Sequence, residues 1–131
     1  MGLFRRQYQI RLHQPVTGSA RTIQSLPSVA HQTPLMRIQP NDKIISAPLD
    51  GEIVALSPRH LTITALNGQQ FVLQIETTDY HAMVDWQVRI GDSVSPLTIL
   101  GLLEGSLTAT SLVVSRVHAV SQLTKAVVAN S

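Results

Sequence analysis

Imidazole is the side chain in this sequence best suited to chemistry near neutral pH, because one ring nitrogen can act as a nucleophile while a hydrogen bond holds the other. The chain has five histidines and no cysteine, which excludes thiolate chemistry, disulfides and cysteine-ligated zinc. The histidines are widely spaced, at His13, His31, His60, His81 and His118. Because a metal site needs three or four convergent ligands, we expect no metal and no other cofactor unless the fold gathers His31, His60 and His81.

The segment GQQFVLQIETTD, residues 68–79, carries a polar residue inside an apolar run that is typical of a β-strand. Gln74 interrupts the apolar residues between Phe71 and Ile75. Its amide needs hydrogen-bond partners if it is buried. The simplest interpretation is a polar side chain on the outward face of an edge strand.

The composition predicts one folded domain. The chain has 131 residues, of which 44% are hydrophobic, 14% charged and 4% aromatic, so aliphatic side chains must fill a modest core. No apolar run approaches the ~20 residues of a membrane span, and the N-terminal MGLFRRQYQIRLHQP lacks the apolar region of a signal peptide. We therefore expect a cytoplasmic protein. No nucleophile elbow, P-loop or dinucleotide fingerprint is present.

Charge is distributed unevenly along the chain. Residues 1–41 contain arginines but no acid, and the eight acidic residues all follow from Asp42 onward. A basic first third could contact anionic lipid, nucleic acid or an acidic protein, although an ordinary solvated surface explains it as well. Clustered lysines with interleaved aromatics are missing, so we expect no nucleic-acid partner and at most weak membrane-surface contact through the N-terminus.

Short β-rich runs separated by turn residues predict an all-β fold, an antiparallel β-sandwich. The Asn67–Gly68 pair between two such runs is the clearest hairpin signal. Helical periodicity is confined to Arg116–Lys125. The inward residues are expected to include Ile45, Ile53, Ile63, Val72, Ile99 and Val113. The predicted runs are Tyr8–Leu12, Leu35–Ile38, Lys43–Ile45, Glu52–Leu56, Leu61–Ala65, Phe71–Glu76, Thr98–Leu102 and Leu112–Val114.

A turn motif is repeated within the chain. HQPVTGSARTI (residues 13–23) and SAPLDGEIVAL (residues 46–56) share a P-x-x-G core, and VRIGDSVSP (residues 88–96) is a related turn. Proline presets the entry to such a turn, and glycine supplies a backbone conformation that other residues reach only at a cost. The repetition predicts a pseudo-symmetric sandwich.

The segment NDKIISAPLDGEIV (residues 41–54) resembles the N-K-x-x-x-A-P-x-D-G-x-[IV] stretch of the glucose-type enzyme IIA domain of the bacterial sugar phosphotransferase system. QPVTGSARTIQSLPSVA, NGQQFVLQ, VRIGDSV and LTATSLVVSRV resemble other segments of that family, in the family's order. The resemblance implies a sandwich of the duplicated-hybrid-motif, glucose-permease IIA type over residues 8–131, after a basic leader at 1–7.

The family's activity is implied by the same resemblance. Its members accept a phosphoryl group from the phosphocarrier HPr on one histidine, supported by a second histidine, and pass it to the IIB domain of a membrane sugar transporter. Gln74 occupies the acceptor position in this chain, and an amide cannot carry a phosphoryl group. The resemblance therefore implies a phosphotransferase-system protein whose relay is degenerate. The alternative is a non-catalytic regulatory or protein-binding module with the same fold.

The other site residues follow from the alignment to the family. The supporting position falls on His60 or on Arg59, depending on one residue of register. Partner-binding residues are expected at His31, Phe71 and Val72. A biotin- or lipoyl-type carrier is not supported, because SAPLDGEIV is not followed by the Met-Lys tip that such carriers modify.

Overall fold

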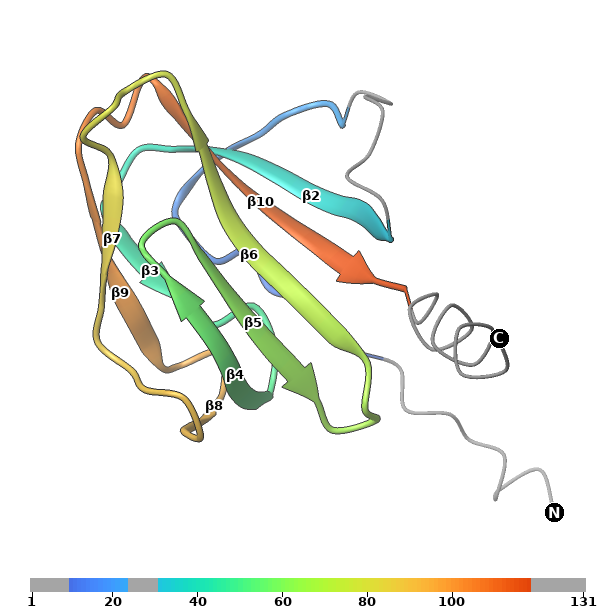
Figure 1. Ribbon diagram of the computed structural model, residues 1–131. Coiled ribbons are helices and arrows are strands. Elements are labelled where there is room, and N and C mark those ends of the chain that lie inside the picture. Colours follow the sequence, from blue (N-terminus) through green and yellow to red (C-terminus); the bar gives the residue numbers. More distant parts are fainter. Residues whose placement is uncertain (1–9, 24–30, 119–131) are drawn as a thin grey trace, which may run out of the picture.

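The computed structural model describes residues 10–23 and 31–118, and this part of the chain is all-β (Figure 1). It contains no helix of the length and apolar character that crossing a membrane requires. The strands are β1 (Gly18–Ala20), β2 (Gln32–Pro40), β3 (Ile44–Ser46), β4 (Gly51–Ser57), β5 (His60–Ala65), β6 (Gln70–Thr77), β7 (Met83–Trp86), β8 (Ser93–Val94), β9 (Ile99–Glu104) and β10 (Thr110–Val117).

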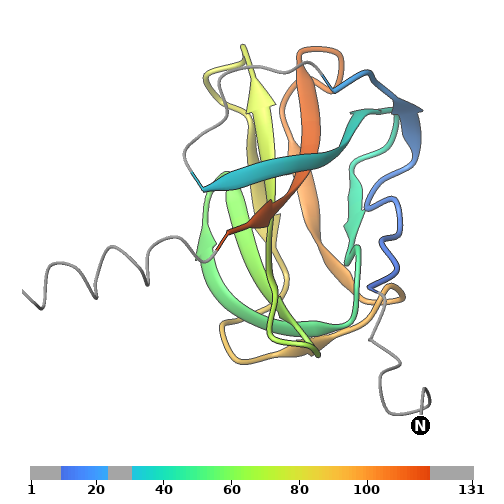
Figure 2. The same cartoon turned by 90° about the vertical axis from the view of Figure 1, so that its right-hand side faces the viewer.

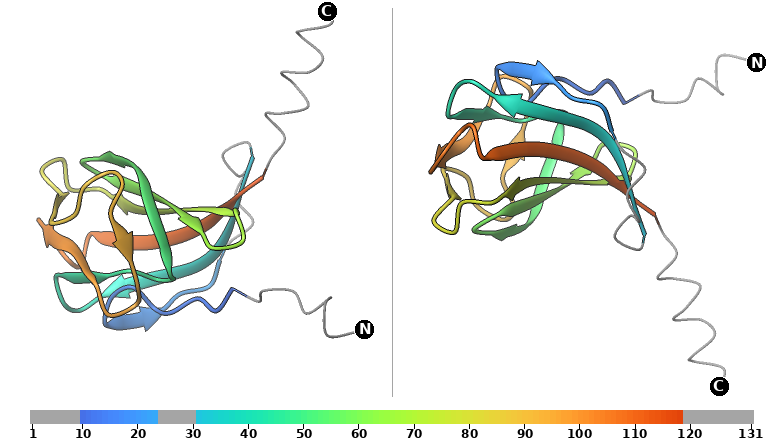
Figure 3. Two further views of the ribbon diagram at one scale, coloured as in Figure 1. Left: turned by 90° about the horizontal axis from the view of Figure 1, so that it is seen from below. Right: turned by 90° about the horizontal axis from the view of Figure 1, so that it is seen from above.

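The strands form two antiparallel sheets, which confirms the all-β, sandwich-like fold. One sheet has seven strands in the order β1-β2-β10-β6-β5-β4-β8, and the other has three in the order β3-β9-β7. The view in Figure 2 shows β2 crossing in front of β10 and β6. The views along the strands in Figure 3 show the larger sheet curling around the smaller one. The curl encloses one core between the sheets.

Alternate apolar side chains on the central strands fill this core. Leu61 and Ile63 on β5 and Leu73 on β6 are at most 2% exposed. The prediction that Ile45, Ile53 and Ile63 point inward is confirmed, because all belong to the buried cluster.

Three other core predictions need correction. Val72 and Val113 are buried, but each alternates with core residues on its strand and lies on the opposite face of the larger sheet. Ile99 is 51% exposed. A register shift places Ser46 opposite Ile99 and Ile45 opposite Gly101, so Leu100 is the extra residue and takes the buried position.

The repeated P-x-x-G turns contact each other reciprocally. The amide of His13 donates to the carbonyl of Pro48 at 2.7 Å, and the amide of Ser46 donates to the carbonyl of Pro15 at 2.7 Å. The same sequence spacing separates His13 from Ser46 and Pro15 from Pro48. The two bonds are therefore related by a local pseudo-twofold axis, as the repetition predicts.

The glycines of these turns are required by close packing. A Cβ on Gly18 would lie 2.1 Å from the carbonyl oxygen of Gln39, and one on Gly51 would lie 2.3 Å from that of Thr64. Neither has a positive φ; among the glycines of the described residues, positive values occur at Gly68, Gly91 and Gly105. The expectation of a special backbone conformation thus holds for the third turn, at Gly91, while the first two need glycine because a neighbouring strand passes close by.

The predicted β runs from Leu35 onward each overlap a strand, and the Asn67–Gly68 turn joins β5 to β6 as predicted. Gly68 has a φ of 89° and its amide donates to the carbonyl of Ala65 at 2.9 Å. The short strands β1, β7 and β8 have no clear alternation and were not predicted. Ile10–Leu12 is not a strand, and Arg116 and Val117 belong to β10. The β run predicted at Tyr8–Leu12 and the helical segment predicted at Arg116–Lys125 are therefore wrong where they can be checked. Their remaining residues, 8–9 and 119–125, lie outside the described residues, and His118 follows β10.

Asp79 joins two loops at one end of the sandwich. Its Oδ1 accepts a hydrogen bond from the amide of His81 and its Oδ2 accepts one from the amide of Ser106, both at 2.9 Å. The bond from Ser106, then that from His81, lowers the pKa of the Asp79 carboxyl below its usual 3.8. Gly105 has no room for a side chain here, since a Cβ would lie 2.8 Å from Asp79 Oδ2.

We expect Asp79→Ala to destabilise the protein at neutral pH by removing both acceptors. A carboxyl with a lowered pKa in the folded state stabilises that state above pH 3.8, and this stabilisation is lost as the pH falls through the lowered value. Denaturant unfolding at a series of pH values should therefore show the wild type and the variant converging in strong acid. Asp85→Ala, which removes an exposed carboxylate on β7, is the control. A difference for Asp79→Ala that persists unchanged in strong acid would contradict this explanation.

Candidate functional site

Gln74 lies on the outer face of the larger sheet, opposite the core. Its neighbours Leu73 and Ile75 belong to the buried cluster, and alternation turns Gln74 the other way. Its strand, β6, is flanked by β10 and β5. The interpretation of an edge strand is therefore wrong, although the outward orientation is as expected.

His60 is the residue directly across from Gln74. The two are Cα partners in the antiparallel pair β5–β6. The amide of Ile75 donates to the carbonyl of Arg59 at 3.0 Å, so the adjacent His60–Gln74 pair is of the non-hydrogen-bonded kind, in which facing side chains approach most closely. His60, and not Arg59, is therefore the residue that faces Gln74 across the pair.

A short turn orients the His60 ring. Ser57 and His60 pair at the end of the β4–β5 hairpin, with Pro58 and Arg59 as its two-residue loop. Ser57 Oγ and His60 Nδ1 share a hydrogen bond of 2.5 Å. With Nδ1 engaged by the hydroxyl, Nε2 is the ring nitrogen left for an external group.

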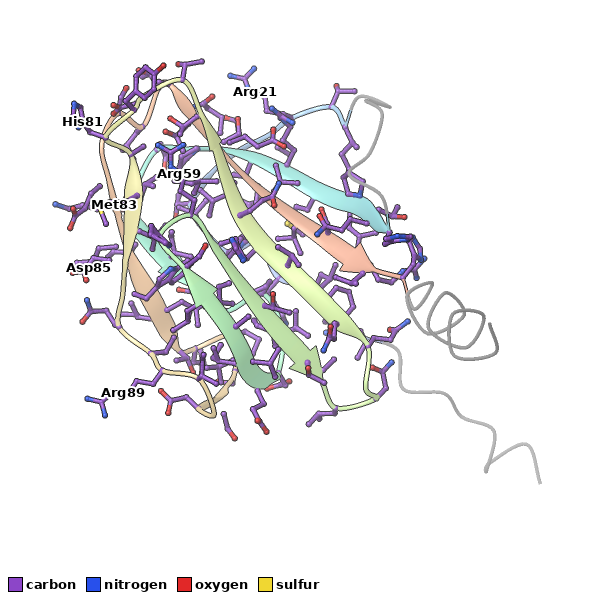
Figure 4. All side chains as sticks on the ribbon, in the orientation of Figure 1. Arg21, Arg59, His81, Met83, Asp85 and Arg89 are labelled. Carbon is purple, nitrogen blue, oxygen red and sulfur yellow. The ribbon has the colours of Figure 1, made fainter. Side chains whose placement is uncertain are left out.

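Arg59 has a structural role on the other side of this turn. Its Nε donates to the carbonyl of Ala82 at 3.1 Å and its Nη2 to that of Tyr80 at 3.0 Å. Figure 4 places Arg59 between β6 and β7, away from the outer surface of β7 where His81 and Met83 project. The guanidinium thus ties the β4–β5 turn to the loop that precedes β7.

Two further bonds from β7 hold the same turn. Trp86 Nε1 donates to the carbonyl of Ser57 at 2.6 Å, and the amide of Val84 donates to that of Pro58 at 2.9 Å. Ser57, Pro58 and Arg59 are therefore all anchored, either to β7 of the smaller sheet or to the loop that precedes β7. The position of His60 is a consequence of the packing of the two sheets.

Residues on the outer face form a row that continues from Gln74 across β10 to β2. Val113 is the partner of Gln74 on one side and of Arg37 on the other. Arg37 Nη1 lies 2.7 Å from Glu76 Oε1, an ion pair that crosses over β10. Val113 is 3% exposed, so this part of the face is closely covered. We call the set Ser57, His60, Gln74, Val113 and Arg37 the outer-face row.

The three predicted partner-binding residues are not brought together. His31 is exposed at the start of β2 with a φ of 74°, and its carbonyl accepts from the amide of His118 at 2.7 Å. Val72 is on the outer face but only 6% exposed. Phe71 points into the core and is 4% exposed, because it alternates with Val72 along β6. Phe71 therefore does not lie on the outer face of the larger sheet.

The fold does not gather the histidines into a metal site. Across residues 10–23 and 31–118, no group of three or more potential ligands is close enough to hold an ion. His81 lies in the loop between β6 and β7 (Figure 4), His60 begins β5, and His31 precedes β2.

Sequence reasoning missed Ser57, Arg37 and Glu76. A signal existed for Ser57, since Pro58 marks a turn and residues flanking a two-residue hairpin loop face each other. Arg37 and Glu76 are far apart in sequence and meet only through strand order.

The comparisons with known proteins assign no family: a scan against protein-family models finds no match, and neither does a search of curated proteins.

We expect the adjacent residues Arg59 and His60 to respond differently to truncation. Arg59→Ala should lower the free energy of unfolding by about 1–2 kcal/mol, because it removes charge-assisted bonds to several loop carbonyls. His60→Ala should change it by less than about 0.5 kcal/mol, as for an exposed residue. Urea unfolding of both variants measures this. A larger loss for His60→Ala would contradict the assignment of the structural role to Arg59.

Proposed function

We propose that this chain is an enzyme IIA-like protein of the sugar phosphotransferase system whose relay position no longer accepts a phosphoryl group. It acts by docking a protein partner at the accessible end of the outer-face row, at the exposed His60 and the half-buried Gln74. The observation that carries the proposal is the His60–Gln74 pair, an imidazole facing an amide across two neighbouring strands. Two facing histidines are what the resemblance implies for an active relay.

The fold is compatible with this proposal. The sandwich-like architecture and the reciprocal contact of the P-x-x-G turns support the duplicated motif that the resemblance implies. Gln74 lies on a central strand opposite a histidine held by Ser57, and this supports assigning the two residues to the acceptor and supporting positions that the resemblance implies.

The side chain of Gln74 permits the docking of a protein partner but not the transfer of a phosphoryl group. The nitrogen lone pair of an amide is delocalised and does not attack phosphorus, whereas the amide can donate and accept hydrogen bonds as one side of an imidazole does. Gln74 therefore preserves a polar contact at the centre of the face without providing a nucleophile. Under this proposal the partners are HPr or a IIB domain of a sugar transporter, in the cytoplasm, and binding has a regulatory outcome.

The proposal predicts that the wild type takes no phosphoryl group from phosphoenolpyruvate, enzyme I and HPr, and that Gln74→His takes some. Restoring the ring supplies the nucleophile, and His60 across the pair can hydrogen-bond the transferred group. We expect partial recovery, since a misplacement of about 1 Å can cost ~10²-fold in rate. Intact-protein mass spectrometry detects the added phosphoryl group.

Two controls make the result specific. Gln70→His places an imidazole on the same face of β6, opposite Thr64 instead of His60, and should remain unmodified. Adding His60→Ala to Gln74→His should abolish the recovery. Phosphorylation of the wild type on any histidine, or equal phosphorylation of Gln70→His and Gln74→His, would refute the proposal.

A further inference from the structure

A pocket of about 380 Å³ lies on the core side of the larger sheet, away from the outer-face row. Its lining residues come from the end of β10, the start of β6 and the turn before it, β2, and the first described residues. Its volume is within the range of small-molecule sites, about 300–1,000 Å³. The lining residues are Ile10, Leu12, Leu35, Gln69, Phe71 and Arg116.

Arg116 gives the pocket a positive charge, and no acidic side chain is among the lining residues. It is the Cα partner of Phe71, so the two side chains share one face of the sheet. All eight acidic residues lie between Asp42 and Glu104, within the described part of the chain, and none lines the pocket. The one ion pair found among the described residues joins Arg37 to Glu76 and leaves Arg116 out.

Gln69 adds a second hydrogen-bond donor. Its Oε1 accepts from Asn67 Nδ2 at 3.0 Å, which fixes the amide and leaves both N–H groups of Nε2 to donate elsewhere. The polar side chains that line the pocket therefore offer donors. The other four lining side chains are apolar.

We propose that this pocket binds a small amphiphilic carboxylate. The planar guanidinium of Arg116 matches a carboxylate in two parallel hydrogen bonds, and Gln69 donates to the remaining lone pairs. The aliphatic or aromatic body of the ligand packs on Ile10, Leu12 and Leu35. One arginine and one amide suit a singly charged carboxylate better than a phosphate, which carries more charge. The site is independent of the proposed phosphotransferase role.

Isothermal titration calorimetry of the wild type at neutral pH tests the pocket with octanoate as the probe. Octanol has the same tail without the charge, and acetate has the charge without the tail. Octanoate should bind at least about tenfold more tightly than either, because charge-assisted bonds and apolar burial are both needed. Absence of octanoate binding to the wild type, or equal affinity for octanoate and octanol, would by itself overturn the proposal.

Substitution then locates the site. Arg116→Gln should weaken octanoate binding by about tenfold to a hundredfold. Arg116→Lys should weaken it by less, since lysine keeps the positive charge but cannot donate two parallel hydrogen bonds to the carboxylate. Arg89→Gln is the matched control, because Arg89 is exposed on the loop after β7 (Figure 4) and should leave binding unchanged. Thermal unfolding verifies that each variant is folded. Octanoate binding to folded Arg116→Gln with wild-type affinity would refute the assignment.

Discussion

The register of β5 against β6 is the constraint on which the candidate site depends. Side chains alternate along a strand, so a slip of one residue would bring Arg59 to the outer face and expose the core residues Leu61 and Ile63. Burying each such aliphatic side chain contributes about 1.5–3 kcal/mol, so the slipped register would cost several kcal/mol. The core thereby determines which residue faces Gln74, even though neither His60 nor Gln74 belongs to it.

The two ends of the β5–β6 region are fixed by different means. At one end, Asn67 and Gly68 form a local turn with their own hydrogen bonds. At the other, Ser57, Pro58 and Arg59 are held from outside by Trp86, Val84 and the carbonyls before β7. A site residue on a hairpin loop is usually mobile. Here the anchored loop gives His60 a fixed place beside a central strand.

The sequence was informative where the signal is local and periodic. Alternation predicted the core residues Ile45, Ile53 and Ile63, and the Asn67–Gly68 pair predicted its hairpin. Periodicity carried no information about the bulge that buries Leu100 and exposes Ile99, because one inserted residue inverts the pattern. The choice between Arg59 and His60 was open because it depends on the register of β5 against β6, which one inserted residue would shift. The contacts that hold Arg59 on the other side run to carbonyls about twenty residues away, and no short-range pattern predicts them.

Cysteine cross-linking tests most directly whether His60 faces Gln74, and the chain is suited to it because it contains no cysteine. Non-hydrogen-bonded antiparallel partners have Cα atoms about 4.5 Å apart, within the disulfide range of about 4.4–6.8 Å. We predict that His60→Cys with Gln74→Cys forms an intramolecular disulfide on mild oxidation, as measured by thiol titration. Arg59→Cys with Gln74→Cys should stay reduced, since residue 59 faces the other side of the sheet. The opposite pattern, with the residue 59 pair cross-linked and the residue 60 pair reduced, would contradict the account.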